Sequence, residues 1–183
     1  MLLLVLGVAL WWAAHLFKRF APDARAQLGD KGPGFVAIAL VVAIVLMVFG
    51  YRSAGDVFLW AAPYWTLHLN NLVVLVAFYM TSPAPKKGKL LAGMRHPMLA
   101  GFALWAGAHL VVNGDLASLV LFGGLLVWAL SELVVINRAE PEWQPRPGGS
   151  LAKDAMFFGA SIVLVLVIGF LHGWLGPSPF PGG

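Results

Sequence analysis

Long apolar runs separated by short polar connectors dominate the pattern of the chain. Six runs stand out, at about residues 2–17, 34–51, 64–80, 97–113, 116–136 and 155–175. A helix needs roughly 20 mostly apolar residues, each rising ~1.5 Å, to cross a bilayer. Prolines fall in the connectors or at the first turn of a run, where a missing N–H is tolerated. The pattern predicts an all-α polytopic integral membrane bundle of about six transmembrane helices.

The composition agrees with a bilayer as the main solvent and limits the available chemistry. Of 183 residues, 60% are hydrophobic and 11% charged, more apolar than a soluble core of this length can hide. We expect one transmembrane domain over residues 1–176 and a short disordered tail over 177–183. The chain has no cysteine, which excludes disulfides, thiolate metal sites and cysteine nucleophiles. Histidine is then the natural metal ligand.

The basic residues are distributed unevenly among the connectors. Of twelve lysines and arginines, only Arg52 falls in an even-numbered connector. Such a bias marks the odd connectors as cytoplasmic and places both termini of a six-span protein in the periplasm. Orienting the chain in the membrane is sufficient reason for its net charge of +4, so no nucleic-acid partner is expected. The other eleven are Lys18, Arg19, Arg25, Lys31, Lys86, Lys87, Lys89, Arg95, Arg138, Arg146 and Lys153.

Histidines within or beside the runs are the first candidates for chemistry, because polar side chains are costly in the membrane. They lie at positions 15, 68, 96, 109 and 172. His96 and His109 share one run but are thirteen residues apart, about 20 Å of rise and on different faces. A metal site must therefore combine histidines from different helices. The alternative is that each histidine is an interhelical hydrogen-bond partner, and for His172 we adopt this interpretation.

Polar and aromatic residues near these histidines form two further patterns. Trp105, His109 and Asn113 follow at i, i+4 and i+8, a stripe that is either packing or one wall of a cofactor site. Asn113 or a backbone carbonyl would hold the second ring nitrogen of His109. The third run adds a polar group that we expect to face inward, namely His68, Asn70 and Asn71.

Charged residues near the cytoplasmic ends, and the motifs that are missing, complete the picture. Glu132 is a candidate for a buried pair with Arg95 or with a histidine, and a proton relay is the functional alternative. No Walker A pattern, Rossmann glycine pattern, His-Glu-x-x-His or Gly-x-Ser-x-Gly occurs. Hydrolases of those classes and nucleotide-driven activities therefore have no support.

Several segments together resemble the NnrU family over nearly the whole chain from residue 1 to about 138. They are HL at 15–16, LGDKG at 28–32, GY at 50–51, RHPML at 95–99, LWAGAHL at 104–110 and NGD at 113–115. The resemblance implies a bacterial inner-membrane protein associated with denitrification and needed for the output of nitrite and nitric oxide reductases. Those enzymes or their assembly factors would be its partners. The family has no settled biochemical activity.

NnrU proteins in turn resemble zeta-carotene isomerase, a membrane enzyme that binds haem b and isomerises a polyene. Its two haem-ligand histidines lie in the motifs that His15 and His109 match here. The resemblance implies haem b, isomerase-like or redox chemistry, and a hydrophobic small molecule as substrate. The isomerase has a cysteine where this chain has Ala106, so only bis-histidine ligation carries over. His15 and His109 are expected at different depths, so tilted helices or a longer first helix must bring them together; otherwise His68 pairs with His109.

A second resemblance suggests a different enzyme. Residues 95–101, RHPMLAG, are similar to a segment of isoprenylcysteine-type methyltransferases that binds S-adenosylmethionine, so Arg95 and His96 would contact that cofactor. Those enzymes carry an adjacent glutamate pair, whereas here a proline separates Glu140 from Glu142. A non-enzymatic accessory factor for the denitrification enzymes is the third alternative.

Overall fold

The computed structural model describes residues 1–180, and every named element within them is helical. Each apolar run contains one long helix: α1 (Leu2–Phe20), α3 (Gly32–Arg52), α4 (Trp65–Thr81), α6 (Pro97–Val112), α8 (Gly124–Ala139) and α9 (Leu151–Leu175). The fifth run, residues 116–136, begins with two short elements before α8. Short elements connect them: α2 (Pro22–Gln27), η1 (Gly29–Lys31), α5 (Ala84–Lys87), α7 (Leu116–Ser118) and the π-helical turn η2 (Leu119–Gly123).

Length and hydropathy support several membrane crossings. Among the described residues, four helical stretches are long and apolar enough to span a bilayer, and α4 and α6 are shorter apolar helices of 17 and 16 residues. The four are Leu2–Phe20, Gly29–Arg52, Leu116–Ala139 and Leu151–Leu175. The prediction of an all-α, multi-pass membrane bundle is confirmed.

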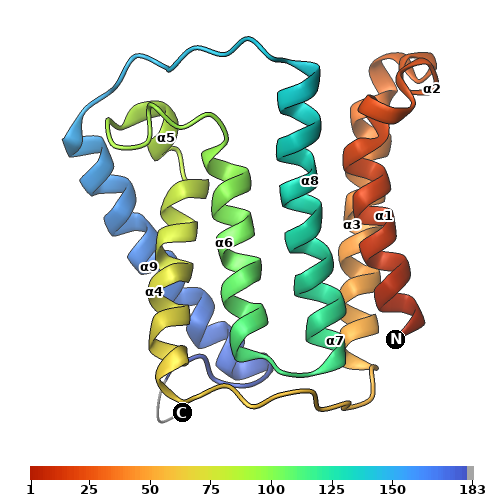
Figure 1. Ribbon diagram of the computed structural model, residues 1–183, viewed down its shortest axis with the longest axis vertical. Coiled ribbons are helices and arrows are strands. Elements are labelled where there is room, and N and C mark those ends of the chain that lie inside the picture. The colour runs from red at the N-terminus through yellow and green to blue at the C-terminus, as the bar shows by residue number, and fades with distance from the viewer. Residues whose placement is uncertain (181–183) are drawn as a thin grey trace.

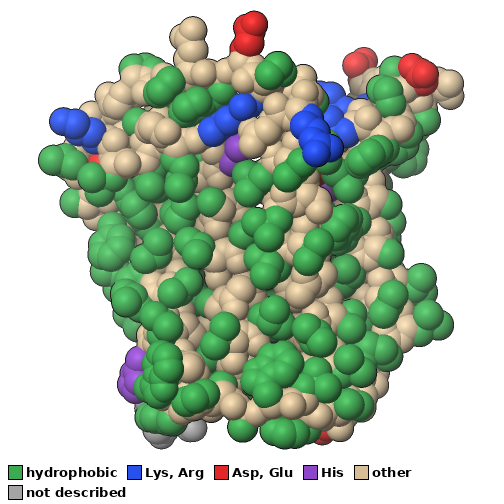
Figure 2. Space-filling view, viewed as in Figure 1, with side chains coloured by type: hydrophobic (Ala, Val, Ile, Leu, Met, Phe, Trp, Pro, Cys, Tyr) green, Lys and Arg blue, Asp and Glu red, His purple; other side chains and the backbone are tan. Residues whose placement is uncertain are grey.

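The long helices alternate in direction, so the two ends of the chain lie at the same end of the bundle (Figure 1). The connectors that hold the basic residues, including α2 and α5, lie at the opposite end. In the space-filling view the lysines and arginines gather at that end, and hydrophobic side chains cover the middle of the visible face (Figure 2). This is the charge distribution expected of a protein whose basic end contacts the membrane surface.

Two helix boundaries differ from the expected runs for local reasons. α1 continues to Phe20 and stops at Ala21, whose φ of −133° lies outside the helical region because Pro22 follows. α9 begins at Leu151, four residues early, because Ser150 caps it by accepting a hydrogen bond from the Lys153 N–H at 3.3 Å.

Glycine allows α1 and α3 to approach each other closely. A Cβ on Gly50 would lie 2.2 Å from the backbone nitrogen of Leu4, and one on Gly7 would lie 2.8 Å from that of Met47. Close contact through small residues is typical of helix pairs in membranes, where packing rather than the hydrophobic effect holds helices together. α1 thus carries α3 on its outer side and contributes Leu4 to the buried core.

An extended segment closes the end of the bundle opposite the basic connectors. Leu59 and Trp60 donate their N–H groups to the Gly114 carbonyl at 2.7 and 3.1 Å, and Leu116 donates to the Val57 carbonyl at 2.9 Å. A Cβ on Gly114 would lie 1.8 Å from the Trp60 oxygen, so this pairing requires glycine. The segment before α4 is therefore tied to the α6–α7 connector.

Asp154 attaches the start of α9 to the rest of the bundle. Its carboxylate, 3% exposed, accepts hydrogen bonds from the Tyr79 hydroxyl at 2.6 Å and from the backbone N–H groups of Lys89 and Leu90 at 2.6 and 3.2 Å. These three donors satisfy a carboxylate that would otherwise be costly to bury.

At the other end of α9, residues 177–180 of the expected disordered tail contact α4 and α9: Asn71 donates to the Pro179 carbonyl at 2.9 Å, and Phe180 packs on Phe170. Residues 181–183 lie outside the described part of the chain.

Candidate functional site

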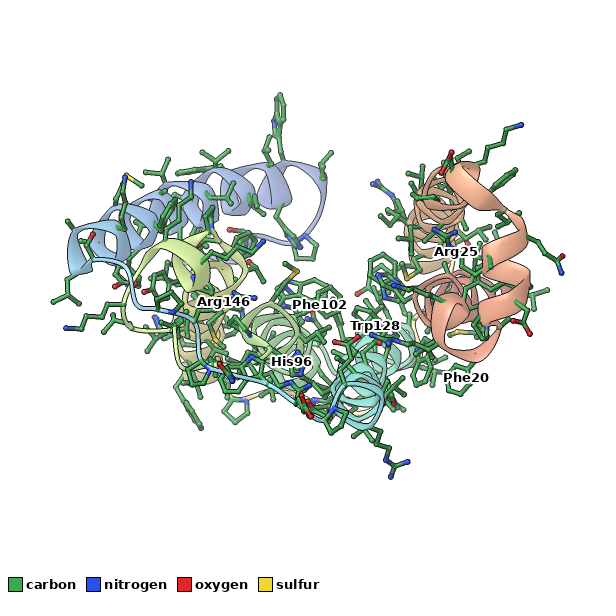
Figure 3. All side chains as sticks on the ribbon, turned by 90° about the horizontal axis from the view of Figure 1, so that it is seen from above. Phe20, Arg25, His96, Phe102, Trp128 and Arg146 are labelled. Carbon is green, nitrogen blue, oxygen red and sulfur yellow. The ribbon has the colours of Figure 1, made fainter. Side chains whose placement is uncertain are left out.

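Seven aromatic and imidazole rings from α1, α6, η2 and α8 form a continuous group, here called the aromatic cluster. Neighbouring ring centroids lie 4.4 to 6.1 Å apart. Residues three or four positions apart share a helix face, which is why α1 and α6 each present several rings to the same space. Figure 3 shows Phe102 and Trp128 between these helices. The cluster consists of Trp11, His15, Phe102, Trp105, His109, Phe122 and Trp128.

His15 lies at one end of the aromatic cluster. Its ring is 4.4 Å from Trp11 and 4.4 Å from Trp128, between centroids. Its Nδ1 lies 3.0 Å from the Trp11 carbonyl oxygen, which can only accept. In the neutral ring, Nδ1 therefore carries the proton and Nε2 keeps a free lone pair. This is the state in which an imidazole binds a metal.

Two buried indole N–H groups beside His15 lack acceptors. The Nε1 atoms of Trp11 and Trp128 are buried, and neither has a hydrogen-bond partner among residues 1–180. The neighbouring Trp12, in contrast, donates its Nε1–H to the Gly124 carbonyl at 3.0 Å. A buried donor without an acceptor costs about 1–3 kcal/mol, so such groups are uncommon in native proteins. Two of them flanking one histidine indicate a place where a bound group supplies the missing acceptors.

His109 lies at the other end and is held in the same way. Its Nδ1 is 2.9 Å from the Trp105 carbonyl, and its ring packs against Trp105 and Phe122 at 5.0 and 4.9 Å. Of the two partners considered from the sequence, the backbone carbonyl therefore holds the ring, and Asn113 donates instead to the His109 carbonyl at 2.7 Å. Phe122 belongs to the π-helical turn η2, a type of irregularity that is frequent at functional sites.

The two histidines contact the cluster at different depths. His15 packs against Trp128 of α8, and His109 packs against Phe122, six residues earlier, which is about 9 Å at ~1.5 Å per residue. Imidazole nitrogens bind a metal at about 2 Å, so one iron held by both rings requires them to be much closer. The donor chemistry of each histidine fits haem, but both together do not reach one iron in this conformation.

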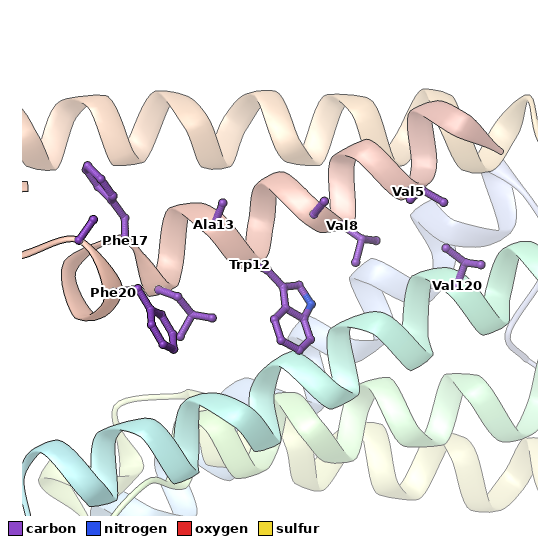
Figure 4. A pocket seen from close by; sticks show the side chains of 10 residues that line it. Val5, Val8, Trp12, Ala13, Phe17, Phe20 and Val120 are labelled. Carbon is purple, nitrogen blue, oxygen red and sulfur yellow. The ribbon is translucent and has the colours of Figure 1, made fainter. Parts of the chain in front are cut away.

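An apolar groove of about 690 Å³ runs along α1, and Val120 of η2 is the lining residue that comes from outside α1 and its C-cap. Figure 4 shows side chains of α1, including Trp12, Phe17 and Phe20, with Val120 from η2 on the opposite side. Trp12 lines the groove, whereas the adjacent Trp11 belongs to the aromatic cluster. The groove and the cluster therefore lie on different sides of α1. The volume lies within the ~300–1,000 Å³ range of small-molecule sites, and the lining suits an apolar molecule.

The expectation that His68 faces inward with its neighbours is wrong. His68 is exposed and packs edge-on against Tyr64 at 5.7 Å, whereas Asn70 is 8% exposed. Two positions along a helix correspond to about 200° of rotation, so His68 and Asn70 lie on nearly opposite faces. The structure does not bring His68 to the aromatic cluster.

Arg95 and His96 lie at the basic end, away from the cluster. His96 Nε2 is 2.8 Å from the Asn137 amide oxygen, and Arg95 donates to the backbone carbonyl of Glu140. The Glu140 carboxylate is 2.5 Å from Arg19, and this hydrogen bond holds the pKa of Glu140 below its usual range. It is the one ion pair between side chains in residues 1–180, so the expected pair of Glu132 with Arg95 does not form there.

The histidines do not form a multi-ligand metal site. No group of three or more histidine, aspartate or glutamate side chains able to hold a metal ion occurs in the described residues. Haem needs only one or two protein ligands, so this absence concerns sites for free metal ions and not sites for haem.

Comparisons with known proteins identify a family but no characterised relative. No curated protein and no solved structure matches the sequence. A family model described as "NnrU protein" matches residues 3–179, which is nearly the whole chain and includes both ends of the aromatic cluster. The chain therefore belongs to the NnrU family.

Proposed function

We propose that this NnrU protein binds haem b at the aromatic cluster with His15 as an axial ligand. His109 does not reach the same iron in this conformation, so it would become the second ligand only after a shift of α1 relative to α6. The observation that carries the proposal is the pair of unpartnered indole N–H groups of Trp11 and Trp128 beside the free Nε2 of His15. A haem has an iron that the imidazole can bind. It also has carboxylate groups that can accept the hydrogen bonds of the two indole N–H groups. The bound group would supply redox or isomerase-like chemistry in the membrane.

Hydrogen bonds and ring packing within the cluster orient the groups that would hold the haem. The Trp11 and Trp105 carbonyls hold the Nδ1–H groups, which orients both rings and makes Nε2 a stronger ligand. Tryptophan and phenylalanine faces provide flat apolar walls and keep water from the ligand. The absence of cysteine leaves histidine as the strongest ligand type in the chain.

The visible spectrum of protein purified from haem-supplemented cells tests the proposal. We expect a Soret band that His15→Ala abolishes. A change from low-spin to high-spin in His109→Ala would show that His109 moves to the iron when haem binds. His68→Ala is the matched control, because His68 is an exposed histidine of another helix. A wild-type protein without a Soret band, or a His15→Ala spectrum equal to that of wild type, would refute haem binding.

The apolar groove beside α1 supports a hydrophobic small molecule as the substrate. It lies against the helix that carries His15 and has room for a long apolar chain. The proposed setting is the bacterial inner membrane with both termini periplasmic, where the protein supports denitrification. Complementation of a deletion strain with wild-type and His15→Ala genes, measured as nitrite reductase activity, tests this role. Full activity with His15→Ala would favour an accessory factor that works without haem.

The methyltransferase alternative finds little support at Arg95 and His96. The cavity that these two residues line has a volume of about 160 Å³, below the ~300 Å³ at which small-molecule sites begin. S-adenosylmethionine therefore does not fit there in this conformation. Titration calorimetry with millimolar S-adenosylmethionine should show no heat of binding.

A further inference from the structure

The small cavity at the basic end of the bundle combines positive charge with apolar surface. Lys86 of α5, Arg95 and His96 before α6, and Arg146 of the α8–α9 connector line it, together with Met80, Met98 and other apolar residues. No aspartate or glutamate lines it. Figure 3 labels His96 and Arg146 in the view onto this end of the bundle. The cavity thus collects basic groups from three separate segments.

Hydrogen bonds hold these groups in place, and the nearest carboxylate effect is that of Glu140, whose pKa Arg95 helps to lower. The Arg146 N–H donates to the Ala92 carbonyl at 3.3 Å, which fixes the connector over the loop before α6. His96 is held by Asn137, and Arg95 by the backbone carbonyl of Glu140. Neither contact involves a carboxylate, and Lys86, Arg95 and Arg146 have no ion-pair partner in the part of the chain that the structure describes.

The start of α6 adds hydrogen-bond donors to the same cavity. Pro97 is the first residue of α6, and Met98 and Leu99, which follow it and line the cavity, belong to the first turn. The first N–H groups of a helix have no partner within the helix and carry partial positive charge, which favours an anion. The apolar part of the cavity continues onto the outer surface of the bundle, because Met98 is 62% exposed.

We propose that this cavity binds the phosphate group of an anionic glycerophospholipid of the cytoplasmic leaflet. The volume of about 160 Å³ suits a phosphate group but lies below the ~300 Å³ at which small-molecule sites begin, so the cavity is too small for a nucleotide. Basic pockets between helices at this side of a membrane are suited to acidic headgroups. Lys86, Arg95 and Arg146 contact the phosphate, and the acyl chains follow the exposed surface of α6 beside Met98.

Native mass spectrometry and thermal unfolding of the intact protein test the site with defined lipids. Mixed micelles of detergent with phosphatidylcholine are compared with micelles that also contain phosphatidylglycerol or cardiolipin. We expect retained anionic lipid and a higher Tm for wild type, and at least a fivefold weaker retention for the double variant Lys86→Gln/Arg146→Gln. The matched control is Lys153→Gln/Arg138→Gln, which removes the same charge from exposed positions outside the cavity.

Two results would overturn the proposal. Equal losses in the cavity variant and the control would mean that general surface charge attracts the lipid. A rise in Tm with inorganic phosphate alone that matches the rise with anionic lipid would assign the cavity to free phosphate instead. Failure of this experiment is distinct from failure of haem binding, because the cavity shares no residue with the aromatic cluster.

Discussion

Replacing Gly50 with alanine should separate α1 from α3 and weaken the fold. The added methyl would lie 2.2 Å from the backbone nitrogen of Leu4 and 2.6 Å from its Cα. Because both atoms belong to a helix backbone, no side-chain rotation relieves the contact. The two helices would have to move apart by roughly 1 Å to reach the 3.4 Å of ordinary van der Waals contact.

Two opposing effects set the size of the change. Forcing an extra carbon into a packed contact costs about 1–3 kcal/mol. Alanine in a helix interior gains up to about 1 kcal/mol over glycine. Gly34→Ala in the same helix shows the second effect alone, because a Cβ at Gly34 meets nothing within 4 Å, so the difference between the two variants gives the first. We therefore expect Gly50→Ala to be about 1–3 kcal/mol less stable than Gly34→Ala.

Reversible unfolding in mixed detergent micelles, followed by tryptophan fluorescence and circular dichroism, measures this difference. Haem retention is a second readout, because α1 carries His15 and should shift with the clash. Equal stabilities of the Gly50 and Gly34 variants would refute the close contact of α1 with α3.

Three further predictions concern the α1–α8 contact, acid stability and topology. Trp12→Phe and Trp11→Phe remove the same ring volume, but only Trp12→Phe also removes a hydrogen bond, the one to the Gly124 carbonyl. In the same unfolding assay, on protein without haem, Trp12→Phe should therefore be about 0.5–1.5 kcal/mol less stable than Trp11→Phe. The interaction with Arg19 that lowers the pKa of Glu140 stabilises the fold at pH values above the ordinary glutamate pKa of about 4.3, and this contribution is lost as the pH falls. The Tm of Arg19→Gln should therefore decrease less steeply on acidification than the Tm of wild type. A reporter fused in the connector between α4 and α6 should be cytoplasmic and one at the C-terminus periplasmic; the opposite result at both sites would reverse the orientation.

The positions of the long helices were predictable because the bilayer imposes a length and an apolar composition on every crossing. It was harder to predict which side of a helix faces the neighbouring helices. α4 is apolar on most of its surface, so the pattern around His68 does not distinguish the side that faces neighbours from the side that faces lipid. In a soluble protein, water-exposed polar residues would have provided that distinction.

The candidate site was only partly predictable. The stripe of Trp105 and His109 follows from helix periodicity and is confirmed as a contact. The unpartnered indoles of Trp11 and Trp128 come from different helices, and only their tertiary environment shows that acceptors are missing. The π-helical turn next to His109 likewise has no marker in the sequence.

The bonds of Asp154 have a consequence for biosynthesis. All four elements of the aromatic cluster precede Leu151, so they leave the ribosome and can enter the membrane before α9 is made. When α9 follows, its carboxylate finds Tyr79 and the Lys89 and Leu90 N–H groups already in place in an earlier segment. The last helix thus packs against helices that are already in the membrane and holds them together. A chain cut short after α8 would retain every residue of the cluster.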